Sequence, residues 1–418
     1  MQSNVEHEGR STCRSSPPPL GYCLFMSSSS TKVRSQKAAS LYFRSLDLGN
    51  WRNFRRVDVE LQRRVFLVGP NAAGKSNFLD VFRFLHDLVA IGGGFTAAVE
   101  NRGGVSQLRS LSARRPPEVS IRVQVGTDDE THWEYELSFV QDKQRRPMVA
   151  RERVVSRGEV LFSRPDEEDQ ADPERLTQTH LEQVNVNKRF RPLVEFFESV
   201  RYLHLVPQLV REPDRSVGKT NDPFGGDFLE QIARTQERTA KSRLRKIGNA
   251  LRVAVPQLEA LEFERDPDRG TPHLRGKYEH WRPQGAWQDE SQFSDGTLRL
   301  LGLLWSILAG TGPLLLEEPE LSLHPEIVRH LPQMFARIAR RPGRQIFVST
   351  HSPDILQDSG IGLNEVLLLM PQSEGTKIQP ASAFDDVRAL LEGGVDLAEA
   401  VIPKTRPRHA DQLALFAE

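Results

Sequence analysis

The sequence predicts an α/β fold, with a parallel sheet at its centre, an antiparallel β subdomain and a helical lobe. Two short, wholly apolar runs, 65–68 and 314–316, are typical of strands that are buried on both faces of a parallel sheet. Alternating apolar and polar residues between about 118 and 162 predict an antiparallel meander. Apolar residues at helical spacing predict a helix over 75–89 and a long amphipathic helix over 225–256.

The composition and the hydrophobic pattern of the chain change near residue 41. Residues 1–39 are rich in Ser and Pro and poor in periodic apolar residues, so this composition predicts a disordered tail. Alternation over 42–61 then predicts two antiparallel strands that lead into the first apolar run. Whether translation starts at Met1 or at Met26 stays open.

The other elements follow from local composition and periodicity. An acidic stretch bounded by Pro, 166–174, predicts a surface loop, and the stretch 266–288, rich in Gly, Pro and charge, predicts a turn-rich excursion. The remaining predicted elements are, in order, a strand at 200–206, a helix from 292 through Trp305, a helix at 325–341, strands at 346–348 and 366–369, and short helices at 384–391 and 397–402.

The composition narrows the class of protein. The 56 basic and 56 acidic residues cancel, so any affinity for nucleic acid must come from a local patch. The only two cysteines, Cys13 and Cys23, exclude a disulfide framework and cysteine-based metal clusters, and they fit a reducing compartment. No stretch approaches the roughly 18 apolar residues of a membrane span. Because Pro17–Pro19 interrupt the apolar residues at the start, we expect a cytoplasmic protein without a secretory signal or membrane contact.

A phosphate-binding loop follows the first apolar run. Two glycines four residues apart, then Lys and a hydroxyl residue, match the Walker A pattern between a strand and a helix. The residues are Gly69, Pro70, Asn71, Ala72, Ala73, Gly74, Lys75 and Ser76, with Asn77 next. Glycines allow successive backbone N–H groups to converge on a phosphate at the helix N-terminus. Lys75 would reach the β- and γ-phosphates of ATP, and the Ser76 hydroxyl would be a Mg²⁺ ligand.

Two adjacent carboxylates follow the second apolar run. Glu317 and Glu318 come directly after a predicted strand, so we expect them at the carboxyl edge of the parallel sheet, where ligands bind. Glu317 would hold Mg²⁺ directly or through water. Glu318 would act as the general base that polarises the attacking water.

Two further motifs complete the distal half of the predicted site. His351 comes directly after the strand predicted over 346–348 and the Ser349-Thr350 pair, and its imidazole would bond the γ-phosphate. The segment from Phe293 opens an apolar helix and offers Ser294, a flexible Gly296 and a helix N-terminus for a phosphate. Taken alone, this second motif is also an ordinary helix N-cap.

The ordered set of motifs resembles one branch of the ABC ATPases. From about residue 41 to about 372, the chain is similar to the RecF/SMC/OLD branch. The similarity lies in the Walker A loop, the Ser-Asp-Gly signature at 294–296, Glu-Glu after an apolar strand, Leu-Ser-Leu-His-Pro at 321–325 and Ser-Thr-His-Ser at 349–352. More narrowly, the chain resembles the RecF-like predicted ATPases. This resemblance implies an ABC-type ATPase head, that is, a P-loop NTPase sheet with an antiparallel β subdomain, plus a helical lobe.

The resemblance also implies roles for individual residues. Ser294 and Gly296 would contact the γ-phosphate bound to the partner subunit, and 321–325 would be the D-loop that couples two sites. Gln208 would be the Q-loop residue that contacts Mg²⁺ and the attacking water. Arg52, Asn53 and Phe54 fall where relatives approach the nucleotide.

The sequence departs from the family pattern in three places. Glu317 replaces the usual Asp of Walker B, a variant that Glu-Glu-Pro-Glu ATPases share, and this puts the metal geometry in doubt. Asp295 stands where many relatives carry Gly. The segment after His351 is short and carries no acidic Asp-x-Asp cluster after a strand, so a fused Toprim nuclease is not expected.

The same resemblance divides the chain into five segments. They are a disordered tail at 1–39, the N-terminal part of the ATPase head with Walker A and the meander at 40–186, the Q-loop and helical lobe at 187–292, the C-terminal part of the head with signature, Walker B, D-loop and switch His at 293–372, and a C-terminal helical tail at 373–418.

One face of the helix predicted over 225–256 is basic. At 100° per residue a narrow sector carries Arg234, Arg238, Lys241, Arg245 and Arg252, while another sector is apolar. Such a ridge would neutralise phosphates of double-stranded DNA and make binding sensitive to salt. A solvated helix face accounts for the same pattern.

Together these observations predict a cytoplasmic ATPase that forms an ATP-dependent homodimer and acts on double-stranded DNA in recombination, double-strand break repair or genome maintenance. One alternative is a defence-system ATPase that regulates a separately encoded effector protein. A transporter ATP-binding cassette is a third class, and the divergent signature, the long meander and the Glu-Glu-Pro-Glu sequence argue against it.

Overall fold

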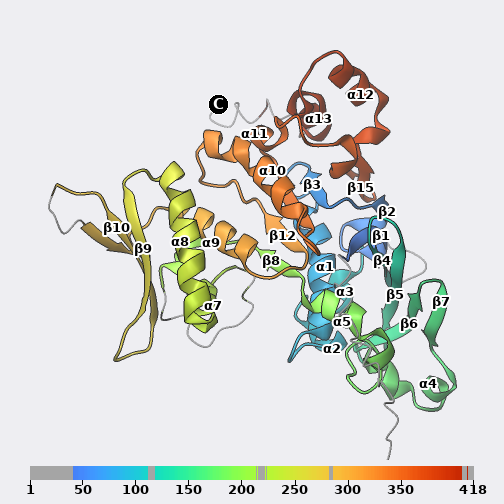
Figure 1. The fold of residues 1–418 in the computed structure, drawn as a ribbon. Coiled ribbons are helices and arrows are strands. Elements are labelled where there is room, and N and C mark those ends of the chain that lie inside the picture. The colour runs from blue at the N-terminus through green and yellow to red at the C-terminus, as the bar shows by residue number, and fades with distance from the viewer. Residues whose placement is uncertain are drawn as a thin grey trace, which may run out of the picture. The chain divides into compact units, whose positions relative to one another are not determined.

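The computed structural model describes residues 41–111, 118–212, 214, 222, 224–281, 286–406 and 412 of the 418-residue chain (Figure 1). All of them belong to one compact unit, Ala39–Glu418. Their sheets and helices form the α/β fold that the sequence predicts. The tail predicted over 1–39 lies outside the described residues.

The central sheet is mainly parallel. Its strands, in spatial order, are β15 (Gly375–Pro380), β14 (Val366–Gln372), β3 (Arg64–Val68), β13 (Ile346–Thr350), β12 (Leu314–Glu317) and β8 (Arg201–Leu203). All neighbours from β14 to β8 pair in parallel, and β15 pairs antiparallel with β14. The carboxyl ends of β3, β12 and β13 therefore meet at one edge of the sheet, and each is followed by a predicted motif.

The apolar runs fill two cores, one on each face of this sheet. Val65 and Leu67 belong to the core that includes α1 (Lys75–Val89), whereas Phe66 and Val68 belong to the core that includes α9 (Asp295–Leu308) and α10 (Pro325–Ala339). This alternation is the reason why the whole run is apolar, since side chains of a strand point to opposite faces in turn. The run predicted the strand correctly.

A second sheet is antiparallel throughout. In spatial order it contains β2 (Phe54–Glu60), β1 (Tyr42–Trp51), β4 (Val119–Gly126), β5 (Thr131–Gln141), β6 (Pro147–Ser156) and β7 (Glu159–Arg164). This sheet confirms the predicted pair of N-terminal strands and the predicted meander. The helical segments near it are α2 (Phe95–Glu100), α3 (Val105–Leu108), η2 (Asn187–Phe190) and α5 (Arg191–Glu198).

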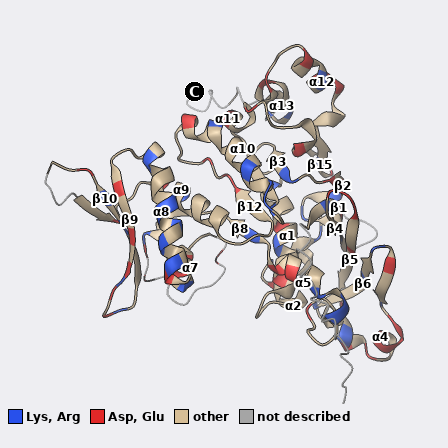
Figure 2. Cartoon of the chain, in the orientation of Figure 1, with Lys and Arg blue, Asp and Glu red and all other residues tan. Residues whose placement is uncertain are grey.

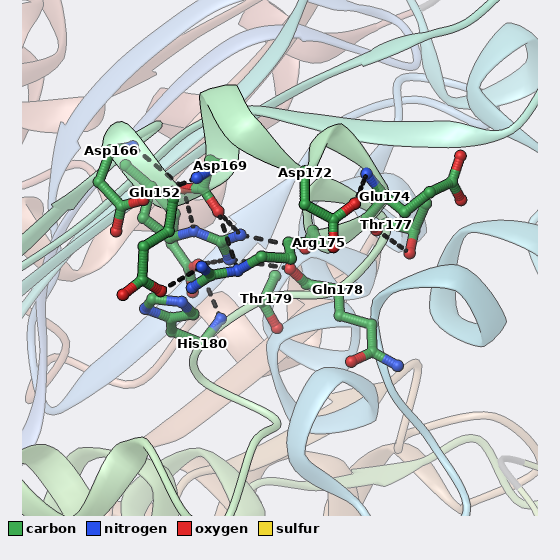
Figure 3. Close-up of polar contacts among 12 residues, drawn as sticks. Glu152, Asp166, Asp169, Asp172, Glu174, Arg175, Thr177, Gln178, Thr179 and His180 are labelled. Carbon is green, nitrogen blue, oxygen red and sulfur yellow. Dashed lines mark hydrogen bonds and ion pairs between the residues drawn. The ribbon is translucent and has the colours of Figure 1, made fainter.

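The acidic stretch 166–174 lies mostly at the surface, as predicted, but it is helical and not a loop. It forms α4 (Glu167–Ala171) and begins η1 (Pro173–Thr177). The carboxylate of Asp169, only 1% exposed, accepts two hydrogen bonds from Arg164, at 2.7 and 2.9 Å. Arg164 also donates to the buried Glu152 at 3.4 Å, and the backbone N–H of His180 donates to the same carboxylate at 2.8 Å (Figure 3). A buried ion pair thus fixes a segment whose charges suggested exposure.

The lobe after β8 contains a sheet as well as helices. Its helices are α6 (Pro207–Val210), α7 (Phe228–Arg234) and α8 (Glu237–Ala254), and its antiparallel strands are β9 (Leu258–Arg265), β10 (Pro272–Tyr278) and β11 (Ala286–Asp289).

Three predictions fail in this lobe. The helix predicted over 225–256 is broken after Arg234, where the Thr235 hydroxyl bonds the Gln231 carbonyl at 2.8 Å and competes with helix continuation. The stretch 266–288 contains a turn at 267–269, but it also contains β10 and most of β11, which the prediction of a turn-rich excursion missed. In addition, β8 is shorter than the strand predicted over 200–206.

The C-terminal part returns to the sheet and ends in helices. It contains α11 (Pro353–Leu356), η4 (Leu363–Glu365), η5 (Ala381–Ala383), α12 (Asp385–Glu392) and α13 (Leu397–Thr405). The last two confirm the short helices predicted there. Within the described part of the chain, no helix combines the length and the apolar character that crossing a bilayer demands.

Candidate functional site

The Walker A loop joins β3 to α1 in a tight turn. Gly74 has a φ of +98°, a left-handed conformation that a side chain would strain. The ammonium of Lys75 folds over the loop and donates to the carbonyls of Gly69, at 2.9 Å, and Pro70, at 3.3 Å. Burial lowers the pKa of Lys75, while the nearby glutamates act in the opposite direction. The cation therefore lies inside the curl of the loop, at the N-terminus of α1.

Asn53 braces this loop from the turn between β1 and β2. Its amide nitrogen donates to the Ala73 carbonyl at 2.9 Å, and its amide oxygen accepts from Asn77 at 2.8 Å. A Cβ added at Gly74 would meet the Asn53 amide at 2.2 Å. Glycine at 74 is thus required by its backbone angle and also by the close approach of Asn53.

Glu317, at the end of β12, contacts hydroxyl groups from two other elements. One carboxylate oxygen accepts from the Ser76 hydroxyl of α1, and the other accepts from the Tyr202 hydroxyl of β8. Burial and the charge of Glu317 raise the pKa of Tyr202 far above its usual range, so this phenol remains a donor. Ser76 and Glu317 offer the hard oxygen ligands that Mg²⁺ prefers, and the two side chains are already in contact. The residues present therefore fit a magnesium ion.

Glu318 lies between Lys75 and His351. Its backbone has a φ of +43°, and its N–H donates to the Ser349 carbonyl at 3.0 Å, which ties the turn after β12 to β13. A carboxylate oxygen of Glu318 lies 3.1 Å from Nδ1 of His351 and 4.0 Å from Nζ of Lys75. Three segments that lie far apart in the sequence thus bring an acid, an imidazole and an ammonium together at the edge of the sheet.

The signature segment caps α9. The Ser294 hydroxyl accepts from the Thr297 N–H at 3.2 Å, and the side chain is otherwise exposed. A Cβ added at Gly296 would meet the Ser322 carbonyl oxygen at 2.4 Å, so only glycine allows this approach of α9 to the 321–325 segment. Arg211, after α6, donates to the Phe293 carbonyl at 2.7 Å and to Asp295 at 2.5 Å.

Comparison with known proteins identifies the family. A protein-family model described as "AAA domain, putative AbiEii toxin, Type IV TA system" matches residues 64–357, well over half of the chain. The chain belongs to this AAA-domain family. The match spans the Walker A loop, both glutamates and His351, and an AAA domain agrees with the predicted P-loop NTPase class. No curated protein sequence matches this AAA domain.

Solved structures of SMC heads also resemble this AAA domain. An Smc head bound to the C-terminal winged-helix domain of ScpA is 12% identical, with a TM-score of 0.49 over 81% of this chain and 97% of that one. The SMC head domain from Thermotoga maritima is 14% identical, with a TM-score of 0.43 over 81% and 98%. An Smc head with an extended coiled coil from Pyrococcus furiosus, bound to the C-terminal domain of ScpA, is 12% identical, with 0.47 over 84% and 99%.

Gln208 stands apart from the cluster in this AAA domain. It lies in α6 with an exposed side chain, and among the described residues this side chain forms no hydrogen bond with Ser76, Glu317 or Glu318. Its assignment as the Q-loop residue remains a prediction.

The basic stripe is less uniform than its sequence suggested. Because the helix breaks, Arg234 lies on α7, 3.5 Å from Glu230, and Lys241 pairs with Glu237 at 2.5 Å. Arg252 donates to the Leu258 carbonyl at 3.0 Å, at the start of β9. Arg238 and Arg245 are the members of the stripe that remain exposed on α8 without a recorded ion pair among the described residues. Figure 2 shows basic residues along α8 and acidic ones on β9 beside it.

Sequence reasoning missed several residues at the site of this AAA domain. Tyr202 and Arg211 act through contacts with segments about 80 to 115 residues away in the chain, and no local pattern reports such contacts. Glu320 carried a signal, since it is the last residue of the Glu-Glu-Pro-Glu sequence, but only its burial, at 7% exposure, separates it from a solvated glutamate.

Proposed function

We propose that the protein binds ATP with Mg²⁺ and hydrolyses it at the edge of the central sheet. The observation that carries this proposal is the convergence of Lys75, Ser76, Glu317, Glu318 and His351 at the carboxyl ends of three parallel strands. Such sites bind phosphate through backbone N–H groups and a lysine, and the metal through a hydroxyl and a carboxylate.

Each side chain has a chemical task in this proposal. Lys75 exchanges its bonds to the loop carbonyls for bonds to phosphate oxygens, and Ser76 and Glu317 hold the metal, which neutralises charge on the phosphates. Glu318 accepts the proton of the attacking water. His351 orients the Glu318 carboxylate through their 3.1 Å contact and reaches the γ-phosphate. The loop 69–74, with Asn71, Ala72 and Ala73 between its glycines, cradles the phosphates by its backbone.

The signature supports an ATP-dependent homodimer. Ser294 and Gly296 lie at the N-terminus of α9, and the Ser294 side chain is exposed. A second copy that places its Ser294 over the nucleotide would complete the site and bury the ligand. ATP would then stabilise the dimer, and hydrolysis would release it. The cytoplasmic location expected from the cysteines is part of this proposal.

We propose that the protein uses this ATPase cycle to act on double-stranded DNA, in recombination, double-strand break repair or genome maintenance. Arg238 and Arg245 project from α8 with Lys241 and Lys246 close by, and α8 packs beside the signature helix α9. Phosphates bound there would be neutralised by long, exposed cations. Arg234 and Arg252 contribute less, since both have protein partners.

A second candidate output is a separately encoded effector protein, as in a defence system. The family description names a toxin of a type IV toxin–antitoxin system, which is a statement about that family. In this chain the favouring observation is an 830 Å³ groove lined by Glu259, Glu262 and Glu264 of β9 and also by Lys241 and Arg245 of α8. A surface of mixed charge suits a protein better than a polyanion.

The experiment is steady-state ATP hydrolysis with and without a double-stranded DNA, across a series of salt concentrations. Stimulation that fades with salt, and that is lost in Arg238→Glu with Arg245→Glu, supports the DNA output. Arg340→Glu with Arg341→Glu, two exposed positions near the end of α10, is the matched control. ATP hydrolysis that DNA leaves unchanged contradicts the DNA output and directs the search to a protein effector.

A further inference from the structure

Glu320 is a buried carboxyl group for which the proposed hydrolysis has no task. It follows Glu318 and Pro319 in the turn after β12 and is 7% exposed. One carboxyl oxygen accepts a hydrogen bond from the Thr350 hydroxyl at 2.5 Å, and the other is buried without a partner among the described residues. A buried oxygen with no partner costs free energy, so the position calls for a compensating role.

The hydrogen bond of Glu320 leads to the backbone around His351. Thr350 is the last residue of β13 and is fully buried. Its hydroxyl oxygen accepts the N–H of Ser352 at 3.0 Å while its proton goes to Glu320. The residues on both sides of His351 are thereby fixed by one hydroxyl group, whose own direction is set by Glu320.

The His351 side chain itself has little else to hold it. It is 50% exposed, and its recorded contact among the described residues is the 3.1 Å approach of Nδ1 to Glu318. The imidazole is attached to the backbone segment 350–352, which the Thr350 hydroxyl holds in place. The direction of the imidazole toward Glu318 therefore depends on this backbone. A shift of this backbone by a fraction of an ångström would lengthen the contact beyond a useful hydrogen bond.

Glu320 also belongs to the loop that meets the signature helix. Its carbonyl accepts the Leu323 N–H at 3.0 Å, and the Ser322 carbonyl lies against Gly296 of α9. Burial, with the charge of Glu318, raises the pKa of Glu320, which suits a carboxyl group that bonds a hydroxyl inside the protein. The same residue therefore touches the 321–325 segment and the segment that carries His351.

We infer that Glu320 is a positioning residue: through Thr350 it holds His351 against Glu318, and it ties this pair to the loop beside the signature. The inference rests on the proposed function, because it assigns a task within ATP hydrolysis at the same site. Glu320 and His351 then act as one unit, so removing either side chain impairs the same step of ATP hydrolysis.

The experiment is a double-mutant cycle on ATP hydrolysis with the full chain. Glu320→Ala and Thr350→Val each remove the bond and should lower kcat about tenfold, with KM changed less than about twofold. Glu320→Gln and Thr350→Ser keep an acceptor and a hydroxyl in the same places and should stay within about twofold of wild type. In the background of His351→Ala, Glu320→Ala should cause little further loss, since coupled residues are not additive.

The readouts separate the possible failures. Affinity for a fluorescent ATP analogue and the thermal midpoint are measured for every variant, so that loss of binding or of folding is seen directly. Multiplicative losses in the double variant, or a Glu320→Gln variant as slow as Glu320→Ala, overturn the positioning role. A wild-type protein without ATP hydrolysis, or a Glu318→Gln variant as fast as wild type, overturns the proposed function instead.

Discussion

At the scale of single residues, Asn53 shows how a side chain outside the Walker A motif supports it. Two hydrogen bonds from its amide hold the Ala73 carbonyl and the Asn77 amide. At about 1 kcal/mol for each bond, Asn53→Ala should weaken ATP binding roughly thirtyfold. Isothermal titration with a non-hydrolysable ATP analogue measures this loss.

The control for this variant is Asn185→Ala, at an exposed position away from the loop. It should bind the analogue like wild type. Equal affinity of Asn53→Ala and wild type would show that the loop keeps its shape without the brace.

Some residues of the candidate site could be predicted from the sequence, and others could not. Lys75 and Ser76 could be predicted from the Walker A pattern. Glu317, Glu318 and His351 could be predicted because they lie at or directly after strand ends, and parallel strands end at a common edge. Their contacts agree with that expectation. Tyr202 could not be predicted, since its hydroxyl meets Glu317 only because β8 pairs with β12 in the folded sheet.

At the scale of elements, Arg344 fixes the C-terminal end of the signature helix. Its guanidinium, 1% exposed, donates to the carbonyls of Ser306, Ile307 and Ala309 at 2.8 to 3.0 Å, and to Gly312 at 2.8 Å. Since the last carbonyls of a helix lack partners within it, this side chain caps α9. Arg344→Ala should lower the free energy of unfolding by about 3 kcal/mol, as measured by urea denaturation.

Arg340→Ala is the matched change, because Arg340 lies four residues earlier with an exposed side chain. It should alter the free energy of unfolding by less than about 0.5 kcal/mol. Similar losses in both variants would contradict the capping role of Arg344.

The segment that carries α4 and η1 should be sensitive to acid. Hydrogen bonds from Arg164 lower the pKa of Asp169 to about 2, against 3.8 for the ordinary group. A depressed pKa means that the ion pair stabilises the fold above about pH 4, and that this stabilisation is lost as pH falls toward 2. Asp169→Asn should cost about 3 kcal/mol at neutral pH, and its difference from wild type should shrink as the pH falls below 4.

Urea unfolding of both proteins at several pH values provides this measurement. Asp268→Asn, at an exposed position in the β9–β10 turn, serves as the control and should follow wild type throughout. A difference between Asp169→Asn and wild type that stays constant with pH would rule out the ion pair as its cause.

Elements were predictable where their periodicity is simple. The wholly apolar strands, the meander and α1 agree with the sequence, since burial on one or two faces leaves a direct trace in the pattern. The segment 166–174 is exposed as predicted except for Asp169, which can be buried because it pairs with Arg164, and composition did not reveal its short helices. The break after Arg234 depends on one hydrogen bond of Thr235, which the periodicity of 225–256 does not reveal.

At the scale of the whole molecule, one chain supplies both halves of the proposed site, and among the described residues no hydrogen bond or ion pair joins Ser294 to the cluster around Glu318. The cluster around Glu318 lies at the edge of the central sheet, and the Ser294 side chain bonds within its own helix cap. Two copies related by a two-fold axis would each offer Ser294 to the other, as an isologous interface requires. We therefore expect the protein to assemble on ATP, an expectation that the sequence supports only through the family resemblance.

The most direct test is the mass of the Glu318→Gln variant in solution, measured by light scattering with and without ATP and Mg²⁺. Loss of the general base should slow hydrolysis at least about 100-fold and trap the bound dimer, so we predict twice the monomer mass with ATP and the monomer mass without it. Glu279→Gln, an exposed control, should hydrolyse ATP like wild type. A Glu318→Gln variant that binds ATP yet stays monomeric, or that hydrolyses it at the wild-type rate, would contradict the account.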